Sequence, residues 1–209
     1  MSARGSETLR RRITQEAARI MAEEGVRDFH AAKRKAAGRL NQSENRHLPS
    51  NSEVEAALAE YLNLFHARDL PHTRQRLLGV ALNTLQLLVR FEPRLVGPLL
   101  QGVATPYSEV QIQAFADNPV EVAVCLQDHN IPYEEYDRRL RYGGERVETA
   151  PVFRFLAGDT SVAIDVLPLR ALREAPLSPV DARPMKRAAI RDVEILLAGL
   201  SPSPANPDS

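Results

Sequence analysis

The sequence predicts an α+β protein, with a helical N-terminal half followed by a small mixed β-sheet with flanking helices. Up to residue 92, apolar residues recur every three or four positions, which is the period of helices that bury one face. Beyond Pro93 they fall in short runs separated by turn residues, a pattern typical of strands. The predicted domains are therefore 1–92 and 93–200, and 201–209 is expected to be a disordered tail because it is polar and rich in proline.

Four helices are expected in the N-terminal half. Gly25 suits the left-handed position just beyond the first helix, and the polar stretch 41–51 is predicted to be a loop. Ser52 is expected to cap the third helix and Thr73 the fourth, which stops before Pro93. The expected helical ranges are 7–25, 29–40, 52–66 and 73–92.

Five strands are expected in the C-terminal half. The pair Gly158-Asp159 marks a hairpin turn between the last two of them. Between the second and third strands, Asn118 and Pro119 are suited to open a helix that reaches Asp128, and a last helix is expected over 185–200. The expected strands are 95–101, 109–115, 133–142, 152–157 and 161–167.

Composition limits the classes of protein to which the chain can belong. A chain of 209 residues with 44% hydrophobic residues can bury a sizeable core. The 27 basic and 27 acidic residues cancel, so no overall field directs it to nucleic acid or to a membrane. No apolar run reaches the roughly 18 residues of a membrane span, and the single cysteine, Cys125, cannot form an intramolecular disulfide. These features predict a soluble, cytoplasmic protein.

Two acidic positions in the predicted sheet need an explanation. Glu109 and Gln111 are two residues apart, so their side chains should project from the same face of one strand. Asp165 lies within the apolar run from Val162 to Leu167. Ionising an acid there costs on the order of several kcal/mol unless the carboxylate is paired or bound to a metal. These three side chains are the candidate site.

The segment GPLLQGVATPYSEVQIQAF, from Gly97 to Phe115, resembles the signature of polymerase-β-type nucleotidyltransferases. In that family a Gly-Ser pair ends one strand, and two carboxylates follow, one residue apart, on the next. Here ten residues, 99–108, separate the pair from Glu109, with Pro98 in place of Ser and Gln111 in place of the second acid. The segment APLSPVDARPMKRA at 175–188 is similar to a group of bacterial nucleotidyltransferase-like proteins. The resemblance implies a nucleotidyltransferase-like fold over 93–200.

The resemblance also implies a chemistry. Family members transfer a nucleotide from a nucleoside triphosphate with divalent metals that neutralise the developing charge. Glu109 and Asp165 would hold Mg or Mn, while Gln111, a poorer ligand, would contact the metal or a phosphate through its amide. Both outcomes stay open: residual metal-dependent nucleotide transfer, or nucleotide binding without catalysis. The residues expected to bind the nucleotide are Gly97, Gly102, Ser108, Arg183 and Lys186.

A binding module is the alternative hypothesis. The N-terminal helices are basic, and phosphate-backbone contact by such a patch would depend strongly on salt. The opening segment from Arg10 to Leu40 also resembles that of tetracycline-repressor-type DNA-binding domains, although the recognition helix expected over 41–51 is absent. Nucleic acid or a protein would then be bound by Arg10, Arg11, Arg12, Lys33, Arg34 and Lys35.

Overall fold

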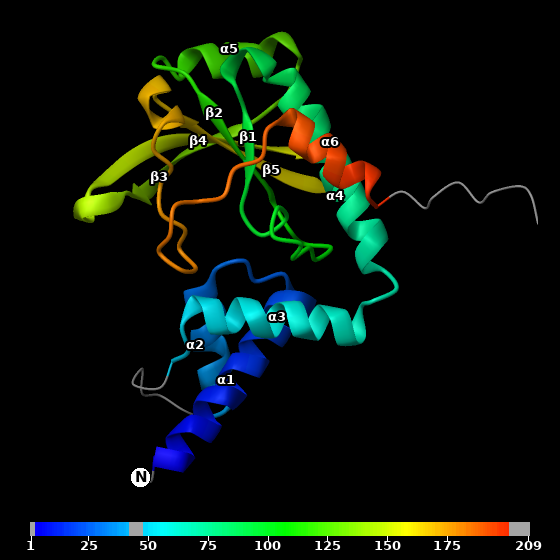
Figure 1. Ribbon diagram of the computed structural model, residues 1–209, viewed down its shortest axis with the longest axis vertical. Coiled ribbons are helices and arrows are strands. Elements are labelled where there is room, and N and C mark those ends of the chain that lie inside the picture. Colours follow the sequence, from blue (N-terminus) through cyan, green and yellow to red (C-terminus); the bar gives the residue numbers. More distant parts are fainter. Residues whose placement is uncertain (1–2, 42–47, 201–209) are drawn as a thin grey trace, which may run out of the picture. The chain divides into compact units, whose positions relative to one another are not determined.

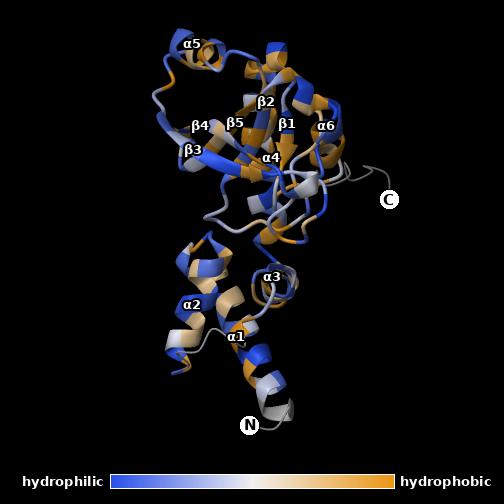
Figure 2. Cartoon of the chain, turned by 90° about the vertical axis from the view of Figure 1, so that its left-hand side faces the viewer, coloured by the Kyte–Doolittle hydropathy of each residue, from blue (hydrophilic) through white to orange (hydrophobic). Residues whose placement is uncertain are grey.

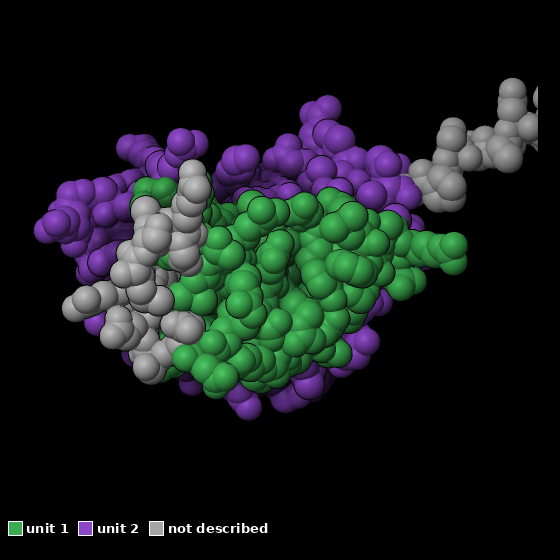
Figure 3. Space-filling model, turned by 90° about the horizontal axis from the view of Figure 1, so that it is seen from below, with its two compact units in different colours: residues 1–70, 105–108, 179–182 green, residues 71–104, 109–178, 183–209 purple. Residues whose placement is uncertain are grey.

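The computed structural model describes residues 3–41 and 48–200. These residues form six α-helices and one five-stranded mixed sheet, which confirms the predicted α+β class (Figure 1). The chain divides into two compact units: unit 1 comprises 1–70, 105–108 and 179–182, and unit 2 comprises the rest (green and purple in Figure 3). The expected tail 201–209 and most of the expected loop 41–51 lie outside the described residues.

Unit 1 is built on three helices, α1 (Ala3–Glu24), α2 (Phe29–Arg39) and α3 (Asn51–Phe65). Both α2 and α3 pack against α1. The buried face of α2 consists largely of alanines, which allow a close approach of the two helices, whereas α1 and α3 contribute larger apolar side chains. The larger buried residues are Ile13, Ile20, Val54, Leu58 and Leu62.

Helix α3 begins two residues earlier than predicted. The N-cap is Ser50 and not Ser52: the Ser50 hydroxyl accepts a hydrogen bond from Glu53 N at 3.2 Å, and Glu53 Oε2 accepts one from Ser50 N at 2.7 Å. This reciprocal pair is a capping box, which needs Ser or Thr three residues before Glu or Gln. Arg10 of α1 also donates to Glu53, at 2.9 Å, so the cap joins two helices.

Replacing Ser50 with alanine is expected to lower the free energy of unfolding of unit 1 by about 1 kcal/mol, because the Glu53 amide loses its acceptor. Chemical denaturation followed by circular dichroism measures the change. Ser50→Asp should retain most of the stability because aspartate caps equally well. Equal losses in the alanine and aspartate variants would contradict the assignment of Ser50 as the cap.

Helix α4 (Leu70–Leu87) belongs to the core of unit 2, whereas the predicted helical domain ran on to residue 92. Its apolar face, with Leu77, Leu78 and Leu85, packs in one cluster with Val110 and Ile112 of the sheet. The helical period of α4 shows that one face is buried, but not against which element. The boundary between the units therefore falls at Leu70 and Pro71.

The sheet has the strand order β1-β2-β5-β4-β3. Strands β2 and β5 are parallel neighbours, and all other pairs are antiparallel. All five expected strands exist; the first is shorter than predicted because the chain turns at Gly97, and the fourth is longer because its residues 147–154 pair with β3. The strands are β1 (Arg94–Val96), β2 (Val110–Phe115), β3 (Glu134–Arg141), β4 (Val147–Ala157) and β5 (Thr160–Leu167).

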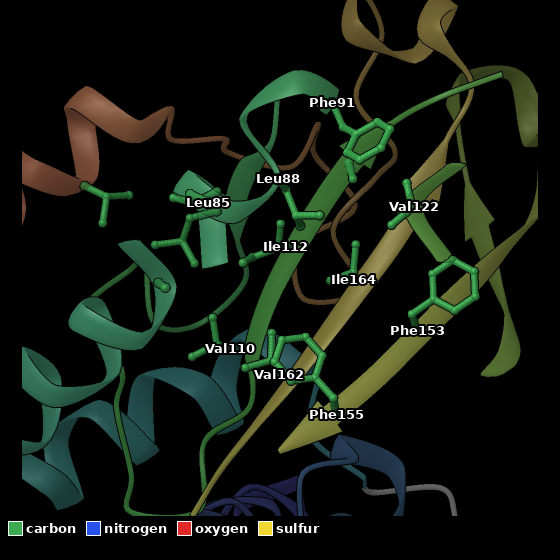
Figure 4. Packing of buried hydrophobic residues seen from close by; sticks show 14 of the residues in the cluster. Leu85, Leu88, Phe91, Val110, Ile112, Val122, Phe153, Phe155, Val162 and Ile164 are labelled. Carbon is green, nitrogen blue, oxygen red and sulfur yellow. The ribbon is translucent and has the colours of Figure 1, made fainter. Parts of the chain in front are cut away.

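The two faces of the sheet differ in polarity. One face is apolar and packs against α4, α5 (Val120–Asp128) and α6 (Ile190–Ala198), as Figure 4 shows for part of the cluster. The other, which we call the polar face, carries Gln111, Gln113, Arg138, Arg154 and Asp165. Edge strand β3 is hydrophilic along much of its length (Figure 2). None of the described helices combines the length and the apolar character needed to cross a bilayer.

The last helix is shorter than predicted. Helix α6 begins at Ile190, whereas 185–189 is not helical, and Ala188 exchanges two backbone hydrogen bonds with Leu95 of β1, at 2.8 and 2.9 Å. A short helical turn, η4 (Leu169–Leu172), packs with Phe115 at one end of the polar face. Pairing with a strand edge satisfies backbone groups that a first helical turn leaves without partners. The chain from η4 to α6 (orange in Figure 1) therefore reaches the sheet before it becomes helical.

Candidate functional site

The register of β2 and β5 brings the three candidate side chains to the polar face. Glu109 immediately precedes β2, Gln111 lies opposite Ala163, and Gln113 lies opposite Asp165. Side chains two residues apart on a strand share a face, so Glu109, Gln111 and Gln113 project to the same side, as the spacing of Glu109 and Gln111 predicts. The pairing of Gln113 with Asp165 places Asp165 on that side as well. Glu109 and Asp165 are 9% and 2% exposed, so both acids are buried.

Two arginines bind these carboxylates. The guanidinium of Arg138, from β3, has Nη1 2.9 Å from Asp165 Oδ1 and donates to Oδ2 at 3.0 Å, while its Nη2 lies 3.9 Å from Glu109 Oε1. Arg154, from β4, has Nε 3.1 Å from Glu109 Oε2, and that oxygen also accepts a hydrogen bond from Ser161 at 2.8 Å. Arg138 thus bridges the two acids.

Tyr136 holds the two guanidinium groups in place. Its hydroxyl oxygen accepts a hydrogen bond from Nη2 of Arg138 and another from Nη2 of Arg154, each at 2.9 Å. The guanidinium of Arg154 also lies over the Tyr136 ring, 4.6 Å from its centroid, in a cation–π contact. We call Glu109, Tyr136, Arg138, Arg154 and Asp165 the arginine–carboxylate cluster.

The electrostatics of the cluster follow from burial and pairing. Burial raises the pKa of Asp165 to about 6, against the opposing effect of the Arg138 charge. Burial also disfavours the charge on Arg138, but Asp165, Tyr136 and Glu109 outweigh it, so the pKa of Arg138 is raised and the group stays protonated. At neutral pH the two acids and the two arginines therefore compensate one another.

The residues present do not fit a carboxylate site for two divalent metals. Magnesium and manganese favour hard carboxylate oxygens, yet both acids are already neutralised by guanidinium groups and Gln111 adds no charge. Among residues 3–41 and 48–200, no group of three or more His, Cys, Asp and Glu side chains is placed to hold a metal ion. A metal at Glu109 and Asp165 would have to displace Arg138.

The glycines expected to leave room for a triphosphate have other roles. Gly97 adopts φ +80°, and a Cβ there would collide with Oε1 of Gln111. The space beside Gly97 is thus filled by the Gln111 side chain. Gly102 has φ +88° in the following turn, where the left-handed backbone, and not a close neighbour, accounts for glycine.

The other predicted nucleotide contacts do not join the cluster. The Ser108 hydroxyl accepts a hydrogen bond from Thr105 N at 2.8 Å, and both residues belong to unit 1. Arg183 and Lys186 are exposed and lie in the nonhelical segment, not at a helix start. The neighbouring Arg187 is the residue that reaches the polar face, where it donates to Gln113 Oε1 at 2.7 Å.

The sequence contained a signal for the residues that were missed. In EEYDRRLR, the sequence of β3, Tyr136 and Arg138 are two residues apart and must share a face. Arg154 alternates with Phe153 and Phe155 on β4, which likewise indicates a charged side chain turned away from the apolar core. The identity of their partners depends on the pairing of β3 and β4 with β5, which the sequence does not specify.

The basic N-terminal patch is partly neutralised within unit 1. Arg10 pairs with Glu53 and Lys35 with Glu24. Lys33 is 9% exposed and donates to Pro49 O and to Asn51 Oδ1, at 2.9 and 2.8 Å. Half of the six predicted nucleic-acid contacts therefore have partners inside the protein.

Comparison with protein-family models and with curated sequences identifies no relative. No protein-family model matches the chain, and no curated protein sequence matches it significantly. The family assignment therefore stays a prediction that depends on the segment from Gly97 to Phe115 and on Asp165.

Proposed function

We propose that this protein is a diverged nucleotidyltransferase-like protein that binds a nucleoside phosphate on the polar face without metal-dependent nucleotide transfer. The observation that supports this proposal best is the bridging position of Arg138 between Glu109 and Asp165. In the family that the sequence resembles, carboxylates at these positions bind metal. A guanidinium group there supplies fixed positive charge to the same region.

The two guanidinium groups are suited to contact phosphate. The side chains of Arg138 and Arg154 are 26% and 40% exposed, so both retain access to solvent although they pair with buried acids. Guanidinium groups bind phosphate through two parallel hydrogen bonds, and Tyr136 fixes the orientation of both groups. The pairs with Glu109 and Asp165 position the arginines but also reduce their net charge, so we expect moderate affinity.

Calorimetry of the full chain with ATP tests the proposal. We expect equal affinity with magnesium and with EDTA, and no release of pyrophosphate. Arg154→Gln should weaken binding by about 10-fold or more, because a hydrogen bond to a charged group contributes roughly 1.5–3 kcal/mol. Arg139→Gln is the matched control, since Arg139 is exposed on β3 and points to the other face of the sheet.

Three outcomes would contradict the proposal. ATP binding that requires magnesium and is lost in Glu109→Gln would indicate a metal site at Glu109. Equal weakening in the Arg154 and Arg139 variants would place binding elsewhere. The absence of any nucleoside phosphate binding at millimolar ligand concentration would rule out the proposed function. The nucleic-acid alternative has less support, because Arg10, Lys33 and Lys35 are engaged within unit 1.

A further inference from the structure

Arg187 lies on the polar face with neutral partners only. Its Nε donates to Gln113 Oε1 at 2.7 Å, and its Nη1 donates to the carbonyl oxygens of Ala171 and Leu172 at 2.7 and 3.5 Å. The guanidinium group lies over the ring of Phe115, 5.0 Å from the centroid. These contacts fix the position of the cation without neutralising it.

Two buried polar atoms beside these contacts have no hydrogen-bond partner. They are Nη2 of Arg187 and the hydroxyl oxygen of Tyr142, a residue that is 3% exposed. Tyr142 packs with Phe115, the ring that Arg187 covers, so both groups lie at the same end of the polar face. Burial and the charge of Glu148 raise the pKa of Tyr142, and the charges of Arg187 and Arg146 oppose the rise, which places Arg187 among its charged neighbours. Buried polar atoms without partners are rare.

The acidic residues near Arg187 form ion pairs with other arginines. Glu148 pairs with Arg146 and Arg170, at 3.5 and 3.3 Å, and Glu174 pairs with Arg146. Asp165 pairs with Arg138. In the part of the chain that the structure describes, no carboxylate forms an ion pair with Arg187, and a half-buried cation without a counter-charge is costly.

We propose that Arg187 and Tyr142 bind a phosphate group, either as free phosphate or as part of a nucleotide. One phosphate oxygen would accept from Nη2 of Arg187 and another from the Tyr142 hydroxyl. Both donors would then be satisfied and the charge of Arg187 compensated. The site is separate from the arginine–carboxylate cluster and does not depend on nucleotide binding there.

Thermal unfolding of the full chain in sodium phosphate, against sodium chloride of equal ionic strength, tests the site. Phosphate at about five times its dissociation constant should raise the Tm of the wild type by about 2–4 °C. Arg187→Gln should abolish the rise, and Tyr142→Phe, which keeps the ring, should weaken phosphate binding by about 10-fold. Arg191→Gln, an exposed arginine of α6, is the matched control and should respond as the wild type does.

The absence of a phosphate effect on the wild type would overturn the inference, since a single water molecule between the two groups would then satisfy them. A phosphate-induced rise in Tm that persists in Arg187→Gln would overturn the inference too. If Arg187→Gln does not fold, Tyr142→Phe serves as the test, and an unchanged response to phosphate in that variant would overturn the inference. Titration with AMP identifies the source of the phosphate, because a Tm rise at lower concentration than with free phosphate indicates a nucleotide. The response to free phosphate should survive in Arg154→Gln, so this site and the proposed function can fail separately.

Discussion

Replacing Arg138 with alanine is expected to lower the free energy of unfolding of unit 2 by about 3–5 kcal/mol, the cost of removing one partner from a buried ion pair. The change leaves Asp165, which is 2% exposed, without its cation and takes the bridging charge away from Glu109. Tyr136 also loses one of its two hydrogen bonds. Urea denaturation at pH 7.5, followed by circular dichroism, measures the loss.

Two further variants separate the ion pair from general damage to β3. Arg139→Ala removes an exposed side chain from the opposite face and should change stability by less than about 0.5 kcal/mol. The double variant with Arg138→Ala and Asp165→Asn should be more stable than Arg138→Ala alone, because the buried negative charge is gone. A loss below about 1 kcal/mol in Arg138→Ala would show that Asp165 does not depend on this partner.

The second large effect is a pH dependence that originates at Asp165. Its pKa rises from 3.8 to about 6 on folding, mainly through burial. Between these two values the native state binds more protons than the unfolded state, so the free energy of unfolding falls as pH rises. The destabilising effect is absent below pH 4 and complete above pH 6, and the rise in pKa from 3.8 to about 6 corresponds to about 3 kcal/mol.

Comparison of the wild type with Asp165→Asn isolates this contribution. From pH 4 to pH 7.5 the wild type should lose about 3 kcal/mol of unfolding free energy relative to the variant, which has no group to titrate there. The comparison cancels groups such as Glu53, whose pKa is lowered to about 2, mainly by its hydrogen bond with Arg10. The control is Asp137→Asn, which changes an exposed acid on β3. Between pH 4 and pH 7.5 its free energy of unfolding should change by the same amount as that of the wild type. A native pKa for Asp165 below 4, measured by NMR, would contradict the prediction.

The structure brings three of the predicted side chains to one face and adds arginine partners that the sequence did not predict. The two-residue spacing of Glu109 and Gln111 was sufficient to place these two side chains on one face, whereas Asp165 joins them through the register of β2 and β5. Arg138 and Arg154 are 27 and 45 residues from the acids that they bind, from 138 to 165 and from 109 to 154. Such pairs form only when β3, β4 and β5 pair in the observed register, and no local sequence pattern specifies that register.

The same distinction explains the differences in the fold. The periodicity of α4 predicted a helix with one apolar face, but its place in the core of unit 2 depends on the surface of a sheet whose strands from β2 onward begin more than 20 residues later. Residues 185–189 lose their predicted helical form because Ala188 finds hydrogen-bond partners on Leu95. Tertiary contacts overrode local preference at 185–189, and in α4 they decided only which surface its apolar face covers.

The sequence by itself determined the α+β class, the five strands, the positions of most helices and the shared face of Glu109 and Gln111. These features depend on periodicity and turn chemistry, which act over a few residues. Only the tertiary structure decided that arginines occupy the carboxylate site, that Gln111 fills the space beside Gly97 and that Arg187 lies without a counter-ion. The physical reason is that charge compensation and packing depend on which distant residues come into contact, and chain folding alone decides that.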